Sequence, residues 1–142
     1  MDINHEIITD SAQATAKVGE ALAHGLAGRI ICLYGDLGSG KTTFTQGFAK
    51  GLGIATRLLS PTFIIVRRYD IPSSGKSEKF FYHIDLYRIT DFEGLGLEEI
   101  FSDPNAIIVI EWAEKLGDAL PKDRIDIHFT TLFDEKHKIT IG

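Results

Sequence analysis

Several features of secreted, membrane and nucleic-acid-binding proteins are scarce or missing in this sequence. A single cysteine, Cys32, excludes an internal disulfide and a multi-cysteine zinc site. No uninterrupted apolar run exceeds five residues, as in Ala106–Ile110, whereas a membrane-spanning helix needs about 20. The first residues, Met1–Glu6, lack the basic and then apolar segments of a secretory signal. We therefore expect a cytoplasmic protein with no membrane association.

Basic residues are also fewer than acidic residues. The chain has 15 Lys and Arg residues against 20 Asp and Glu residues, which gives a net charge of −5. Tight non-specific binding to nucleic acid needs several basic side chains on phosphates. Only Arg67 and Arg68 form an adjacent arginine pair. If the protein acts on RNA, we expect it to do so through a partner.

The length and the overall composition are those of an ordinary globular protein. The chain has 142 residues, of which 44% are hydrophobic and 25% are charged. Both fractions are close to the average of soluble domains, and the length is typical of one domain. We expect residues 1–142 to form a single domain with one sizeable core.

Local patterns predict alternating strands and helices. A helix is expected to begin at Asp10 or Ser11 and to run to about Leu26, because its apolar residues recur at helical spacing. A buried strand, Arg29–Tyr34, precedes a glycine-rich loop and a helix over Lys41–Leu52. Further strands are expected at Phe63–Tyr69, Lys79–Tyr87, Ala106–Ile110, Arg124–Thr130 and Lys138–Ile141, and further helical segments at Phe92–Phe101 and Trp112–Leu120. This order predicts an α/β protein with a mixed sheet that includes antiparallel hairpins.

The strongest functional motif is the glycine-rich loop. Residues Gly35–Thr42 match the phosphate-loop pattern G-x-x-x-x-G-K-[ST] without a mismatch. Glycines let backbone N–H groups surround phosphate oxygens, Lys41 can reach the β- and γ-phosphates, and the Thr42 hydroxyl can ligate Mg²⁺. The residues expected to contact the nucleotide here are Gly35, Asp36, Leu37, Gly38, Ser39, Gly40, Lys41, Thr42 and Thr43.

Two carboxylates are candidates for the metal and water side of the site. Glu111 ends the apolar strand that begins at Ala106, where a Walker-B acid holds the metal in many phosphate-loop proteins. Asp85 shares one strand face with His83 and Tyr87, and such a polar face can position water or a metal. A surface ion pair at Glu111 and a solvent-facing Asp85 are the alternative interpretations.

Two further segments allow more than one interpretation. Ser60–Thr62 follows the phosphate-loop helix at the distance of a nucleotide-sensing switch, so Thr62 is a candidate sensor of the γ-phosphate. A proline-containing turn that leads into a strand explains this segment equally well. Trp112 could cover a ligand, but simple packing is the favoured interpretation.

Taken together, four segments resemble the bacterial TsaE family. They are Gly35–Phe44, Ser60–Phe63, His83–Arg88 and Ile110–Glu114. The resemblance extends over about residues 10–128, and its last three blocks are more specific than the phosphate loop. It implies a three-layer fold of the phosphate-loop NTPase type and an ATPase that uses ATP and Mg²⁺. The ATPase would assist threonylcarbamoyladenosine modification of tRNA at position 37, docked on the TsaD–TsaB pair, with tRNA reached through that complex.

The resemblance also implies roles for individual residues. Lys41 and Asp85 would serve hydrolysis, and Thr42 and Glu111 would bind Mg²⁺. Thr62 would lie in the switch loop. The segment Thr9–Ser11 would lie near the adenosine, which adds Ser11 to the nucleotide-binding residues.

Two other functions remain open from the sequence. A stand-alone small-molecule kinase would need a second-substrate pocket and a basic lid, and neither is evident. A nucleotide-dependent assembly module would bind ATP without needing hydrolysis, and only Asp85 and Glu111 argue against it. Because no arginine finger is obvious, with Arg88 as the one candidate, we expect slow hydrolysis by the isolated chain.

Overall fold

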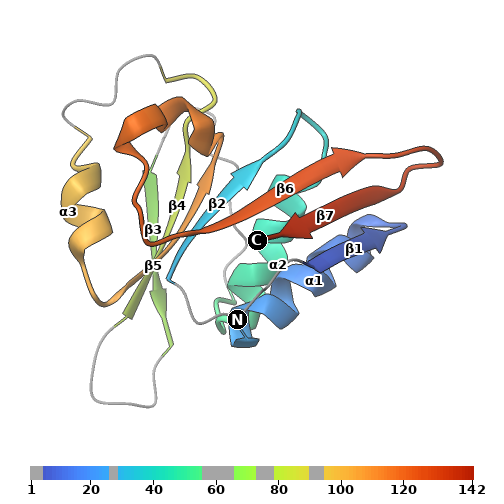
Figure 1. Ribbon diagram of the computed structural model, residues 1–142. Coiled ribbons are helices and arrows are strands. Elements are labelled where there is room, and N and C mark those ends of the chain that lie inside the picture. Colours follow the sequence, from blue (N-terminus) through green and yellow to red (C-terminus); the bar gives the residue numbers. More distant parts are fainter. Residues whose placement is uncertain (1–4, 26–28, 56–65, 73–78, 90–94) are drawn as a thin grey trace.

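Seven strands form one mixed sheet at the centre of the molecule (Figure 1). The computed structural model describes residues 5–25, 29–55, 66–72, 79–89 and 95–142. The strands are β1 (His5–Thr9), β2 (Ile30–Tyr34), β3 (Val66–Ile71), β4 (Lys79–Asp85), β5 (Ala106–Glu111), β6 (Ile125–Thr131) and β7 (His137–Ile141). The helices are α1 (Ala12–Gly25), α2 (Lys41–Gly51), α3 (Leu97–Ser102) and the 3₁₀ helix η1 (Ala113–Ala119).

The strand order β1-β7-β6-β2-β5-β4-β3 places a parallel core between antiparallel edges. Strands β6, β2, β5 and β4 are parallel to their neighbours in this core. Strands β1 and β7 add antiparallel pairs at one edge, and β3 adds an antiparallel pair at the other. The carboxyl ends of β2, β4 and β5 therefore meet at one edge of the sheet, where α/β proteins bind ligands.

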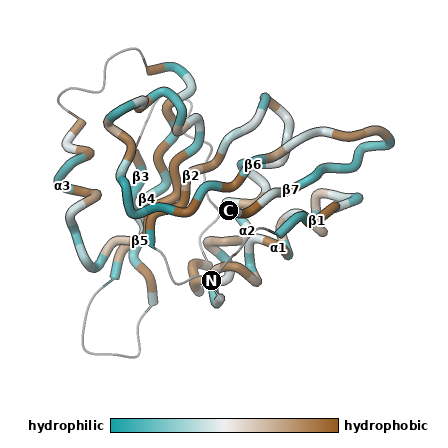
Figure 2. The backbone as a smooth tube through the Cα atoms, viewed as in Figure 1, coloured by the Kyte–Doolittle hydropathy of each residue, from teal (hydrophilic) through white to brown (hydrophobic). Residues whose placement is uncertain are grey.

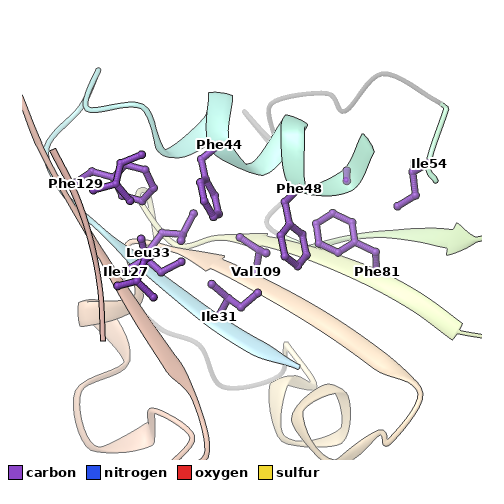
Figure 3. Close-up of a cluster of buried hydrophobic side chains, with 12 residues drawn as sticks. Ile31, Leu33, Phe44, Phe48, Ile54, Phe81, Val109, Ile127 and Phe129 are labelled. Atoms are coloured by element: carbon purple, nitrogen blue, oxygen red, sulfur yellow. The ribbon is translucent and has the colours of Figure 1, made fainter. Parts of the chain in front are cut away.

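Helices cover both faces of the sheet and give it three layers. Helices α1 and α2 lie on one face, and α3 and η1 lie on the other (Figure 1). Under α2 the core is aromatic: the ring centroids of Phe44 and Phe129 are 5.4 Å apart, and those of Phe48 and Phe81 are 5.9 Å apart (Figure 3). The central strands contribute hydrophobic residues to the core on both faces of the sheet, as Figure 2 shows for β5.

Helices α1 and α2 approach each other closely through glycines. A Cβ atom at Gly47 would lie 1.9 Å from the carbonyl oxygen of Ala16, and one at Gly19 would lie 2.2 Å from that of Phe44. Both distances are far below any real contact, so only glycine allows this approach. The contact packs the backbones of α1 and α2 directly against each other.

The expected fold class, an α/β three-layer fold with a mixed sheet, is confirmed. The start of α2 at Lys41 was predicted correctly. Ser11 caps α1 as expected, since its Oγ accepts a hydrogen bond of 3.0 Å from the backbone N–H of Ala14. Both predicted antiparallel pairs, β3 with β4 and β6 with β7, are present.

Other elements differ from the sequence-based expectation. Strand β1 was not predicted. The expected helix Trp112–Leu120 is a shorter 3₁₀ helix, interrupted where Gly117 adopts φ 52° and ψ −122°. Of the expected helix Phe92–Phe101, residues 92–94 lie outside the described residues, and α3 begins at Leu97, directly after Gly96 with its φ of 72°. Ile71 belongs to β3 and not to the following loop.

The single cysteine and the lack of long apolar runs were noted in the sequence. Cys32 is fully buried in β2, and burial raises the pKa of its thiol to about 12. Within the described ranges, no helix has both the length and the apolar character to cross a membrane.

Candidate nucleotide-binding site

The phosphate loop joins β2 to α2 at the carboxyl edge of the sheet. Three of its glycines have backbone angles that other residues rarely adopt, with φ of 148° at Gly35, 76° at Gly38 and 107° at Gly40. A Cβ atom at Gly35 would also lie 2.7 Å from the carbonyl oxygen of Phe129. The glycines therefore allow the turn itself, and the first N–H groups of α2 follow directly after it.

Lys41 lies inside the loop and is only 5% exposed. Its Nζ donates hydrogen bonds to the carbonyl oxygens of Gly35 and Asp36, the latter at 3.2 Å, and lies 3.9 Å from the centroid of the Trp112 ring. Burial lowers the pKa of Lys41, while the carboxylates around it, Glu111 foremost, oppose that shift. The result is a desolvated cation that can exchange carbonyl oxygens for the oxygens of a phosphate.

Glu111 connects the phosphate loop with strand β4. It ends β5 and is only 2% exposed. Its Oε1 accepts a hydrogen bond of 3.1 Å from the Thr42 hydroxyl, and its Oε2 lies 2.5 Å from His83 Nε2. Thr42 and Glu111 are 69 positions apart in the chain. The fold thus joins the two residues that the sequence analysis assigned to the metal.

The donor set around Glu111 fits a hard cation such as Mg²⁺. It consists of a hydroxyl oxygen from Thr42 and carboxylate oxygens from Glu111, with Asp85 directly across from Glu111 in the β4–β5 register. The described residues contain no group of three His, Cys, Asp or Glu side chains arranged to hold a metal. A cation here would therefore take its other ligands from phosphate and water, as Mg²⁺ commonly does.

Asp85 provides a second carboxylate with altered acidity. Its Oδ1 accepts a hydrogen bond of 2.9 Å from the backbone N–H of Tyr87. Burial, and after it the negative charge of Glu111, raise the pKa of Asp85 above its ordinary value. The Tyr87 N–H group, His83 and Lys41 act in the opposite direction and do not cancel the increase. Asp85 is therefore more basic than an exposed aspartate.

Trp112 has a strained backbone beside these groups. Its φ of 58° is left-handed, which is unfavourable for a bulky residue with a Cβ, and such residues cluster at functional sites. The ring lies over Lys41, and its centroid is 5.0 Å from that of Tyr87. The sequence analysis favoured simple packing for Trp112. The structure confirms that Trp112 packs against the hydrophobic core, and it also places this residue on the wall of the cleft.

Lys41, Thr42, Asp85, Glu111 and Trp112 line one open cleft of about 580 Å³. Its lining residues are Ala12, Thr15, Asp36, Leu37, Gly38, Ser39, Gly40, Lys41, Thr42, Thr43, Asp85, Tyr87, Arg88, Glu111, Trp112 and His137. Helix α1 and strand β7 thus contribute to a site that otherwise consists of the phosphate loop, the start of α2, and the ends of β4 and β5 with the residues that follow them. Thr15 is buried and held by a 2.7 Å hydrogen bond between its hydroxyl and that of Thr9.

Comparison with known proteins identifies the family. A family model for "Threonylcarbamoyl adenosine biosynthesis protein TsaE" matches residues 9–139. The chain belongs to the TsaE family. A Bacillus subtilis relative, a tRNA threonylcarbamoyladenosine biosynthesis protein TsaE, is 39% identical over 135 residues, which are 92% of this chain and 78% of the relative. The TsaE protein of Treponema pallidum is 34% identical over 139 residues, which are 95% of this chain and 98% of that protein.

A solved structure supports the same assignment. The crystal structure of Bacillus subtilis YdiB superposes with a TM-score of 0.78 at 34% identity, over 99% of this chain and 86% of that one. The TsaE family takes part in the biosynthesis of threonylcarbamoyladenosine in tRNA. The resemblance drawn from the sequence motifs is therefore confirmed.

The TsaE motifs do not all lie within the cleft lining. Gly35 contributes its carbonyl oxygen to Lys41 and is not on the wall. Ser11 caps α1 one residue before Ala12, which does line the cleft. Thr62 lies outside the described residues, so its switch role stays a prediction.

Sequence reasoning missed three residues of the cleft, namely Ala12, Thr15 and His137. No local motif marks them, because Ala12 and Thr15 reach the site through the packing of α1 on α2, and His137 reaches it through the edge pair of β1 with β7. In that pair Thr9 lies opposite His137. No local sequence signal could have found them, because their place in the cleft depends on long-range packing and strand pairing.

Proposed function

We propose that this TsaE-family chain is an Mg²⁺-dependent ATPase that acts in the cytoplasm with the TsaD–TsaB pair. Its role would be to support threonylcarbamoyladenosine modification of tRNA at position 37, with tRNA bound by the complex. The observation that carries the proposal is one cleft that contains a phosphate loop, the Thr42–Glu111 contact and Asp85.

The phosphate side of the site is assigned from its donors. The N–H groups at the start of α2 and the Lys41 ammonium would bind the β- and γ-phosphates of ATP. Thr42 and Glu111 would hold Mg²⁺, which neutralises charge on the phosphates when bound. Asp85, with its raised pKa, would accept a hydrogen bond from the attacking water and orient it.

The nucleoside part of ATP is assigned to the two cleft elements that do not contact the phosphates, α1 and β7. Ala12, Thr15 and His137 line the cleft from α1 and β7, away from the Glu111 side chain that ends β5. We assign the adenosine to these residues, with Ser11 next to them as the cap of α1. The guanine-recognition motif Asn-Lys-x-Asp does not occur in the sequence, which supports ATP as the nucleotide.

The partner part of the proposal rests on what membership of the TsaE family implies, and the open site is compatible with it. Arg88 is exposed at the cleft and is the arginine nearest to the proposed water-binding carboxylate in the sequence. The net charge of −5 is unfavourable for direct binding of tRNA. If TsaD–TsaB completes the site, hydrolysis by the chain alone would be slow, and ATP turnover would take place at the tRNA.

The deciding experiment measures Mg²⁺-dependent ATP hydrolysis by the purified chain, alone and with the TsaD–TsaB pair. We expect a basal rate well below the ~1–100 s⁻¹ of mature kinases and a clear increase when the pair is added. A rate unaffected by the pair, in a chain that binds ATP, would contradict the partner assignment.

Asp85→Ala separates hydrolysis from simple assembly. We expect this variant to keep ATP affinity within about threefold and to lose at least about 100-fold in turnover, because it removes the water-orienting group. Lys41→Ala is the matched control, since it should weaken nucleotide binding itself. If Asp85→Ala hydrolyses ATP at the wild-type rate, Asp85 has no role in the chemistry.

A further inference from the structure

His83 is the buried neighbour of the proposed metal ligand Glu111. It lies on β4, is 1% exposed, and its Nε2 atom is 2.5 Å from Glu111 Oε2. A buried polar side chain is costly unless its partner is well placed. This pair lies directly behind the cleft, because Glu111 lines the cleft and His83 does not.

The two oxygens of Glu111 have separate partners. An ionised carboxylate can only accept hydrogen bonds, so the Nε2 hydrogen of His83 is donated to Oε2. Oε1 faces Thr42, on the side of the phosphate loop. In the described part of the chain His83 Nδ1 has no hydrogen-bond partner, so the contact of Nε2 with Glu111 is the hydrogen bond that holds the ring.

We propose that His83 is a positioning residue that leaves only one oxygen of Glu111 available to a metal and thereby favours Mg²⁺ over Ca²⁺. The proposal rests on the metal–nucleotide site proposed above. Mg²⁺ binds in a small octahedral shell with one or two carboxylate oxygens and several waters. Ca²⁺ takes six to eight oxygens and commonly binds both oxygens of one carboxylate. Holding Oε2 away from the cleft therefore disfavours the larger ion.

The competing explanation is that His83 has a purely structural role. Two amide variants distinguish that role from the positioning of Glu111. In His83→Gln the amide nitrogen reaches about as far as Nε2, so the hydrogen bond to Oε2 can be kept. In His83→Asn the amide is one methylene shorter and ends near the position of Nδ1. The two variants share the same polar group and lack of charge, and they differ in reach.

The experiment measures the dissociation constant of a slowly hydrolysed ATP analogue by isothermal titration calorimetry, in EDTA, in Mg²⁺ and in Ca²⁺. For wild type and His83→Gln we expect Mg²⁺ to tighten binding more than Ca²⁺ does. For His83→Asn we expect the dissociation constant in EDTA to be unchanged. The factor by which Mg²⁺ lowers this constant should fall about 10-fold or more, and the constants in Mg²⁺ and in Ca²⁺ should differ less than in wild type. Thermal unfolding of each variant confirms that it is folded.

Each outcome has a definite meaning. If Mg²⁺ tightens binding to wild type and His83→Asn keeps the wild-type Mg²⁺ to Ca²⁺ ratio, His83 is only structural and the inference fails alone. If Mg²⁺ has no effect on wild type, the metal site of the proposed function fails, and this inference with it. Should His83→Asn not fold, His83→Leu removes the donor while it fills the buried volume, and the same ratio decides.

Discussion

At the scale of single residues, Asp85 shows that the site is arranged at some cost to stability. Its pKa is raised in the folded chain, mainly by burial. Protonation of Asp85 therefore favours the folded state at low pH, and that contribution is lost as the pH rises through the raised pKa. At neutral pH the ionised carboxylate lowers the free energy of unfolding, although solvent around the partly exposed group limits the effect.

Asp85→Asn should accordingly stabilise the chain. At pH 7 we expect its melting temperature to exceed that of wild type by about 1–3 °C, because the amide carries no charge and still accepts the Tyr87 hydrogen bond. The difference should shrink towards zero as the pH falls below the ordinary pKa of an aspartate. Asp36→Asn, at an exposed position of the same cleft, is the control and should show little change. A lower melting temperature for Asp85→Asn at pH 7 would contradict this account.

At the scale of elements, the contact of α1 with α2 limits substitution most strongly. Gly47→Ala would place a methyl group 1.9 Å from the carbonyl oxygen of Ala16, so the helices must separate. We expect a loss of about 2–4 kcal/mol in the free energy of unfolding, measured by urea denaturation. Nucleotide affinity should fall as well, because both helices line the cleft.

Gly25→Ala is the matched control for that prediction. Gly25 is the last residue of α1, and a Cβ there would meet nothing within 4 Å. The substitution should be neutral or slightly stabilising, since alanine favours helix. Equal losses at Gly47 and Gly25 would show that the interhelical contact does not explain the loss at Gly47, because a Cβ atom at Gly25 meets nothing within 4 Å.

The elements also show which parts of the fold could be predicted from the sequence. Strand β2, the phosphate loop and the start of α2 were predicted because their signals are local: an apolar run, glycines and a lysine at fixed spacing. Strand β1 carries no such signal. It is five residues long, its Ile8 is exposed, and it exists because it pairs with β7 at the other end of the chain.

The same reasoning applies to the site. The sequence analysis selected Thr42, Asp85 and Glu111, because each has a recognisable residue type at the end of a strand or the start of a helix. It noted His83 as part of a polar strand face and did not predict its contact with Glu111. That contact depends on β4 and β5 being neighbours, which is a property of the sheet order and of no local pattern.

At the scale of the whole molecule, ligand binding should stabilise the entire fold. The cleft receives residues from α1, the phosphate loop, the segments after β4 and β5, and β7, so most of the chain must be folded for ATP to bind. At a free Mg²⁺–ATP concentration of 100 times the dissociation constant, the gain is about 2.7 kcal/mol. For a chain of this size that corresponds to about 5–10 °C in the melting temperature.

Differential scanning fluorimetry with Mg²⁺ and a slowly hydrolysed ATP analogue checks this expectation. Lys41→Ala should show a much smaller increase at the same concentration, because its affinity is reduced. A similar increase in both proteins would indicate that the analogue binds somewhere other than the phosphate loop.

The buried thiol of Cys32 has a practical consequence. Because its pKa is about 12 and it is fully buried, almost none of it is thiolate at neutral pH, and reagents cannot reach it. A second cysteine on the surface would therefore be the only one to react with a maleimide dye. Phe133, 92% exposed between β6 and β7, is a suitable position for such a label. The native cysteine can stay in place while fluorescence anisotropy of a Phe133→Cys conjugate reports the docking of a partner protein.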